Sequence, residues 1–204
     1  MEMSTELNDA LVEVRKAYRL VAIYQRRILD MAKIIQKELE YKPYWYVNTK
    51  YDVRNRNVPT DRWSLDMLPL YTGLSMLYLP QQADSNCTKK EEWMLEIRFD
   101  NDSGFNKTDG NEPDPRLFAQ PIECISQLWL CAFGTRADGE KTNWLNNVFN
   151  QTDWPKSGDI SCNERTYAIG KHFDIATIGD EVALLKVIED FKRLVLLKRS
   201  EIGL

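Results

Sequence analysis

A seven-residue repeat of apolar side chains in the first forty residues constrains the fold of this 204-residue chain more than any other feature. Steps of four and three alternate, with one polar position at Gln25, along the series Leu7, Leu11, Val14, Tyr18, Val21, Gln25, Ile28, Ala32, Ile35 and Leu39. Such spacing is typical of a helix that buries one side along its whole length. It predicts a helix over residues 5–41, with Ser4 or Thr5 as N-cap and Pro43 just beyond its end.

Two interpretations of this helix remain open from the sequence. In the first, residues 7–39 form a coiled coil with a second copy of the chain, giving a homodimer in which Gln25 sets the register. In the second, the helix lies on the chain's own sheet or pairs with the C-terminal helix. A second apolar line widens the stripe and favours contact with more than one neighbour; it comprises Ala10, Ala17, Tyr24 and Met31.

A second helix is predicted near the C-terminus. Leu184, Ile188, Phe191 and Val195 share one stripe, and Asp180 is placed to cap the first turn. The cations in the last turns suit the negative end of the helix dipole. We expect this helix to pack on the core.

Short strand-like runs separate the two helices. The clearest is 93–99, where apolar and mostly polar residues alternate, which predicts one buried face and one polar face. Further strands are expected at 74–79 and at 166–178, the latter broken near Gly170, and a short helix is expected at 142–150. Residues 122–133 fit either a strand or a helix and slightly favour a strand.

These elements predict the α+β class. We expect a long N-terminal and a C-terminal helix packed on a mainly antiparallel sheet of about four to five strands. The length is that of a single domain, residues 1–204, from which the heptad-patterned helix could extend.

Composition and motifs exclude several classes of function. No apolar run is long enough to span a membrane and the first residues lack a signal-peptide pattern, so we expect a cytoplasmic protein. The four cysteines are widely spaced and His172 is the single histidine, which leaves too few ligands for a zinc site. Glycine-rich phosphate-binding loops are also absent. We therefore expect no cofactor and no bound metal.

The stretch YKPYWYVNTKYDVRNRN is rich in aromatic and basic residues. If it is extended, Tyr44, Tyr46, Lys50 and Arg54 fall on one face, and Arg56 continues the positive charge. Aromatic rings beside cations are typical of a protein hot spot or of a single-stranded nucleic-acid site. These five residues are the predicted partner-binding residues.

The segment LEIRFDND carries a weaker catalytic alternative. Alternation places Glu96 and Asp100 on one strand face, where two carboxylates, with Asp66 as a third acid, could flank a divalent cation as in a nuclease. Arg98 occupies the position at which such enzymes use a lysine, and a guanidinium is a poor group for proton transfer. A solvated Glu–Arg–Asp ladder is the structural alternative.

Charge is distributed unevenly along the chain, although the net charge is only −4. Residues 1–63 carry 12 basic and 9 acidic side chains, whereas residues 84–164 carry 8 basic and 15 acidic ones. We therefore expect a non-enzymatic interaction protein, such as an adaptor, inhibitor or immunity-type protein, that binds a protein partner through the Tyr/Lys/Arg face or the acidic middle. The alternative is a nucleic-acid-acting protein, either a single-strand binder or a metal-dependent nuclease.

Overall fold

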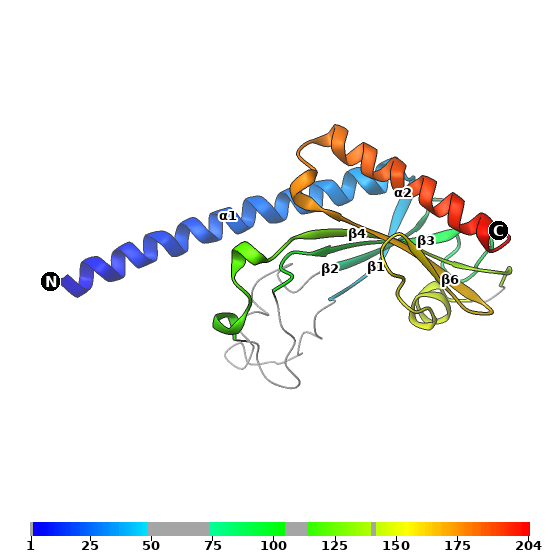
Figure 1. Ribbon diagram of the computed structural model, residues 1–204, viewed down its shortest axis with the longest axis horizontal. Coiled ribbons are helices and arrows are strands. Elements are labelled where there is room, and N and C mark those ends of the chain that lie inside the picture. Colours follow the sequence, from blue (N-terminus) through cyan, green and yellow to red (C-terminus); the bar gives the residue numbers. More distant parts are fainter. Residues whose placement is uncertain (1, 49–73, 105–113, 140–141) are drawn as a thin grey trace. The chain divides into compact units, whose positions relative to one another are not determined.

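The computed structural model describes residues 2–48, 74–104, 114–139 and 142–204 (Figure 1). Chain contacts divide the protein into two compact units, Met1–Ile34 and Ile35–Leu204. The first unit is helical and belongs to α1 (Glu2–Glu38), whose last turn lies in the second unit. The helix is therefore confirmed, with its end at Glu38 instead of 41. It already begins at Glu2, so Ser4 and Thr5 lie inside it and the prediction that one of them is the N-cap was wrong. The chain leaves the helix through Glu40, whose φ is 59°.

Six antiparallel strands form one sheet within the described residues of the second unit, in the order β1-β2-β3-β4-β6-β5. Their bounds are β1 Tyr41–Asn48, β2 Leu74–Pro80, β3 Trp93–Asp100, β4 Gln127–Thr135, β5 Asp159–Cys162 and β6 Thr166–Asp174. The α+β class and the two helices are confirmed, and the sheet has more strands than expected. The sequence did not reveal β5, because four residues with no alternating pattern give no strand signal.

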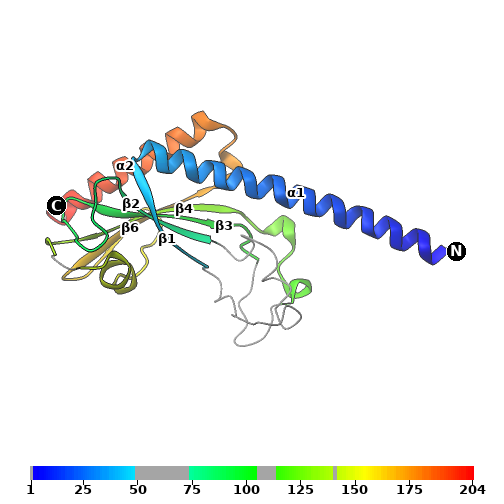
Figure 2. The ribbon, with the colours of Figure 1, turned by 180° about the vertical axis from the view of Figure 1, so that it is seen from behind.

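Helix α2 (Glu181–Glu201) covers one face of the sheet (Figures 1 and 2). Asp180 caps it as predicted, accepting a hydrogen bond of 2.8 Å from the backbone N–H of Ala183. The predicted stripe of four apolar residues is buried, and Phe191 meets Trp93 of β3 edge-on, with ring centroids 6.0 Å apart. The guanidinium of Arg199 fixes the far end of the helix by donating a 2.7 Å hydrogen bond to the Lys90 carbonyl.

The opposite face of the sheet is covered by a π-helical turn, Trp144–Val148, and a 3-10 turn, Phe149–Gln151 (Figure 1). Trp144 and Val148 are buried among a core of apolar residues from four strands and the loop after β2, namely Leu77, Leu79, Ala83, Met94, Cys131, Phe133 and Ala168. The Trp144 indole N–H donates to the carbonyls of Asp84 and Cys87 at 3.1 Å. Both sides of the central strands are therefore buried.

This second layer corrects two expectations about strands. Residues 94–97 of β3 are all buried, so the strand does not have one polar, solvated face. The strand β6 runs through Gly170 without a break. A Cβ at this position would lie 2.5 Å from the Cys131 sulfur and 2.8 Å from Pro155, so a larger residue would not fit. Glycine at this position allows a close approach between layers instead of ending the strand.

The ambiguous segment 122–133 combines both predicted conformations. A 3-10 turn at Pro121–Glu123 begins with proline, and β4 follows from Gln127. Strand was therefore the correct preference for the second part of the segment. The helix expected at 142–150 is present as the two short turns on the second face.

Candidate functional site

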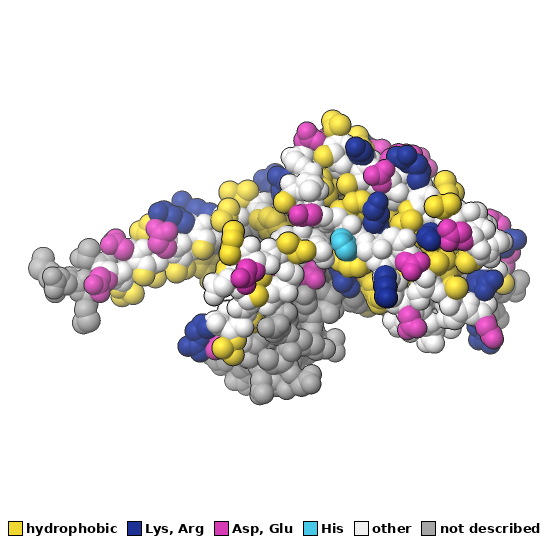
Figure 3. All heavy atoms as spheres, in the orientation of Figure 1, with side chains coloured by type: hydrophobic (Ala, Val, Ile, Leu, Met, Phe, Trp, Pro, Cys, Tyr) yellow, Lys and Arg dark blue, Asp and Glu magenta, His cyan; other side chains and the backbone are white. Residues whose placement is uncertain are grey.

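The predicted heptad stripe is exposed from Leu7 to Val21, just over two heptads of α1. Leu7, Leu11, Val14, Tyr18 and Val21 all lie open to solvent, with Leu7 63% and Tyr18 65% exposed. Apolar side chains are visible along this helix in Figure 3. An apolar stripe of this length on a helix is typical of a surface that another helix covers.

Near the end of this stripe the helix is apolar on nearly every side. In residues 17–24, AYRLVAIY, Arg19 is the one charged side chain. Leu20 and Ile23, which lie outside the heptad positions, are 68% and 69% exposed. Helices of this kind are usually found in protein interiors. The segment is exposed here, although its composition is that of a buried helix.

Strand β1 presents the aromatic residues of the predicted partner-binding face. The register shifts between Pro43 and Trp45, and this irregularity directs Tyr44 against the core of the second face, where its hydroxyl donates to the Asn143 side chain at 3.4 Å. Tyr46 is 73% exposed. The two tyrosines therefore do not form one continuous exposed platform. The three basic residues of this predicted face, Lys50, Arg54 and Arg56, lie outside the described residues.

Glu96 is completely buried in the middle of β3. It lies between Leu77 of β2 and Cys131 of β4 in the strand register, and one carboxyl oxygen accepts a hydrogen bond from the Ser75 hydroxyl. The other oxygen has no hydrogen-bond partner among the described residues. Burial raises the pKa of Glu96 to about 8, although the Ser75 hydrogen bond and the charge of Arg98 oppose the rise. The carboxyl is therefore protonated at neutral pH.

Arg98, two residues further along β3, is held by aromatic rings. Its guanidinium carbon lies 4.5 Å from the ring centroid of Trp154 and 5.4 Å from that of Trp129. The ring of His172 packs edge-on against Trp129, with centroids 4.9 Å apart. Stacking of this kind fixes the guanidinium and favours a structural role over proton transfer.

The structure does not assemble the predicted carboxylate site around a cation. Glu96 is buried, Asp100 ends β3 in a half-buried position, and Asp66 lies outside the described residues. No group of three or more histidine, cysteine, aspartate or glutamate side chains in the described part of the chain has metal-binding geometry. The described helices also include none that is long and apolar enough to cross a lipid bilayer.

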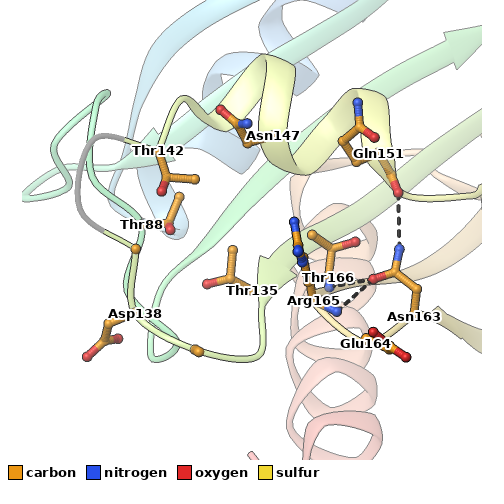
Figure 4. Close-up of a pocket in the computed structure, with 12 residues that line it drawn as sticks. Thr88, Thr135, Asp138, Thr142, Asn147, Gln151, Asn163, Glu164, Arg165 and Thr166 are labelled. Carbon is orange, nitrogen blue, oxygen red and sulfur yellow. Dashed lines mark hydrogen bonds between the residues drawn. The ribbon is translucent and has the colours of Figure 1, made fainter.

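A polar pocket of about 930 Å³ opens at the end of the sheet opposite Asp100 (Figure 4). Its walls come from the loop before β3, the end of β4 with the loop after it, the two short turns of the second face, and the β5–β6 turn. The lining residues are Thr88, Thr135, Ala137, Asp138, Gly139, Thr142, Asn147, Gln151, Asn163, Glu164, Arg165 and Thr166. Sequence reasoning did not identify this site.

Hydrogen bonds fix the walls of this pocket. Asn163 accepts from the backbone N–H groups of Arg165 and Thr166 at 2.8 Å and donates to the Gln151 carbonyl at 3.1 Å (Figure 4). On the other side, Thr88 and Gly139 exchange two backbone hydrogen bonds of 3.0 and 2.8 Å. These hydrogen bonds hold both walls of the pocket in place without a ligand.

The fold and these surfaces define an α+β protein with a heptad-patterned N-terminal helix and a sheet covered on both faces. The chain belongs to the PM0109 family, whose sequence model matches residues 4–199 and thus includes α1. The uncharacterized protein PM0109 of Pasteurella multocida (strain Pm70) is 26% identical over 195 residues, which cover 92% of this chain and 93% of that protein. No solved structure matches this chain.

Proposed function

We propose that this protein is a non-enzymatic interaction protein that associates with further copies of itself through α1. The observation that carries the proposal is the exposed line of heptad residues from Leu7 to Val21. Burying these side chains in a helix–helix seam would remove a large apolar surface from water. The whole heptad pattern from Leu7 to Leu39 exceeds the three to four heptads from which a coiled coil is inferred, and its exposed part covers just over two of them.

The residues that flank the seam favour a second copy as the occupant. In the heptad, Leu11 and Tyr18 occupy the a positions, and the g positions before them are Ala10 and Ala17. In a parallel pair, each g residue meets the e residue five places along the partner chain, so Ala10 faces Arg15 and Ala17 faces Ala22. No like charges meet in this arrangement, and the small side chains allow close packing.

Compartment, partner and activity are proposed on separate observations. The four cysteines, all free in the described residues, support the cytoplasm as the proposed compartment, since reducing compartments keep thiols unpaired. Tyr46, on the outer strand of the described sheet, supports a protein partner at β1. The alternative of a nuclease requires an ionised Glu96, which its buried position opposes.

Analytical ultracentrifugation tests the proposal. The intact chain should sediment as an oligomer, and the double variant Leu11→Gln with Val21→Gln should sediment as a folded monomer, because two polar amides would be buried in the seam. The matched control is Leu20→Gln with Ile23→Gln, which changes two apolar residues outside the seam that are even more exposed than Leu11 and Val21, and it should leave the mass unchanged. A monomeric wild-type chain, or dissociation by the control pair alone, would refute self-association through this seam.

A further inference from the structure

Two buried hydroxyl groups of the polar pocket are unsatisfied in the folded protein. Thr88 is 0% exposed and Thr135 is 6% exposed, and neither hydroxyl oxygen has a hydrogen-bond partner among the described residues. A hydroxyl can donate one hydrogen bond and accept two, and leaving it without any inside a protein is unfavourable. Both residues line the same pocket, so a ligand there can provide the missing partners.

Gly139 lets the chain pass close to the hydroxyl groups on one wall of the pocket. Gly139 lies opposite Thr88, and a Cβ at Gly139 would come within 2.8 Å of the Thr88 hydroxyl oxygen and 2.4 Å of that of Thr142. Figure 4 shows these threonines and Thr135 on one side of the pocket and Gln151, Asn163 and Arg165 on the other. A side chain larger than hydrogen at position 139 would therefore crowd the hydroxyl side of the site.

The chemistry of the lining restricts the class of ligand. Two carboxylates belong to the lining, Glu164 and Asp138, and one oxygen of Asp138 accepts the Lys90 backbone N–H at 2.8 Å. Against them stands the single guanidinium of Arg165, and this balance of charge disfavours a phosphate or another anion. Ala137 and Gly139 are the lining residues without a polar side chain, which disfavours an apolar ligand. The side chains of Gln151 and Arg165 make no hydrogen bond within the described part of the chain, so both can contact a ligand.

We infer that this pocket binds a small neutral carbohydrate. Each sugar hydroxyl can donate to a carboxylate or amide oxygen and accept from a guanidinium, an amide N–H or a threonine hydroxyl, so a polyol satisfies every kind of polar group in the lining at once. The pocket lies in the size range of small-molecule sites, at about 300–1,000 Å³. Thr88 and Thr135 provide the two buried hydrogen-bonding positions, and Arg165 and Gln151 provide the groups at the rim.

The inference does not depend on self-association, because every lining residue belongs to the second unit. The test is titration calorimetry with D-glucose, D-galactose, D-mannose, N-acetyl-D-glucosamine and maltose, together with inorganic phosphate and AMP as anionic probes. At least one of the sugars should bind saturably, and the two anions should not compete with it. Failure of all five sugars to bind, or displacement of a bound sugar by phosphate or AMP, would overturn the inference.

Three variants assign the binding to this pocket. Thr135→Val keeps the shape of the side chain and removes one hydroxyl, so affinity should fall about three- to tenfold, the effect of one hydrogen bond. Gly139→Ala should weaken binding further by crowding Thr88. Thr177→Val, the same exchange at an exposed threonine outside the pocket, should leave affinity unchanged. Sugar binding that stays within twofold of wild type in both pocket variants would place the site elsewhere and refute the assignment.

Discussion

Replacing Glu96 by glutamine should make the protein more stable at neutral pH and remove part of the pH dependence of its stability. Glu96 is fully buried, and burial raises its pKa from the usual 4.5 to about 8. At pH values between 4.5 and about 8, the Glu96 carboxyl is protonated in the folded protein and ionised in the unfolded chain. Because the folded state binds more protons in this interval, the free energy of unfolding decreases as the pH rises.

The size of the effect follows from the same two values. The interval from 4.5 to about 8, at about 1.4 kcal/mol per pH unit, corresponds to about 5 kcal/mol over the whole range. The favourable contribution is complete below pH 4.5, declines as the pH rises, and is fully lost above pH 8. At pH 7 wild type should therefore have lost about 3 kcal/mol relative to pH 4.5.

Glutamine preserves the local contacts of this position. Its amide oxygen can accept the hydrogen bond that the Ser75 hydroxyl donates to Glu96, and its volume is almost the same. The amide does not titrate, so the variant should be about as stable as wild type near pH 4.5 and about 2–3 kcal/mol more stable at pH 7. Glu123→Gln, the same exchange at an exposed position, is the matched control and should keep the wild-type pH dependence.

Urea denaturation at half-unit steps from pH 4.5 to 8.5 measures the prediction. The difference in the free energy of unfolding between Glu96→Gln and wild type should widen from pH 4.5 to about pH 8 and stay constant above it. Parallel curves for the two proteins would refute the argument, because they would show that Glu96 is already ionised in the folded state. That result would in turn favour the nuclease alternative, which needs a charged carboxylate at this position.

Three further substitutions test local features by the same denaturation assay. Gly134→Ala should lower the free energy of unfolding by about 1–3 kcal/mol, since a Cβ there would lie 2.4 Å from the ring of Tyr167, and an unchanged midpoint would show that the ring moves freely. Asp180→Ala should cost about 1 kcal/mol through loss of the α2 cap, and no loss would mean that the cap is dispensable. Thr135→Val should add about 1–2 kcal/mol by removing an unsatisfied hydroxyl, whereas a decrease would reveal a hydrogen-bond partner.

Local patterns in the sequence were sufficient to predict the helices and the clearest strand. The heptads of α1, the stripe and cap of α2, and the alternation in 93–99 each depend on residues close together along the chain. Burial of the second face of β3 could not be predicted in this way. It depends on Trp144 and Val148, which follow the strand by more than forty residues and lie in a segment with only a short helical pattern. Glu96 was therefore expected in solvent and is found in the core.

The polar pocket was missed for a related reason. Its lining comes from several separate segments, and a threonine at a strand end, such as Thr135, is ordinary in sequence. The useful signal is three-dimensional, namely two buried hydroxyl groups without partners among the described residues, one of which lies against a glycine where a Cβ would crowd it. The clusters of threonine and asparagine in 142–152 and 161–166 are the only trace of it in the sequence.

Thr135→Val separates a binding site from a packing defect, because stability and affinity are expected to change in opposite directions. If the hydroxyl were a mere imperfection of the fold, its removal would stabilise the protein and alter nothing else. In a ligand site, the Thr135 hydroxyl is unpaired in the free protein and gains a hydrogen bond only when the ligand binds. Thr135→Val removes that hydrogen bond, so the variant is more stable but binds the ligand less tightly. A variant that is both more stable and weaker in sugar binding would therefore support the pocket as a site of function, and this outcome cannot be attributed to unfolding.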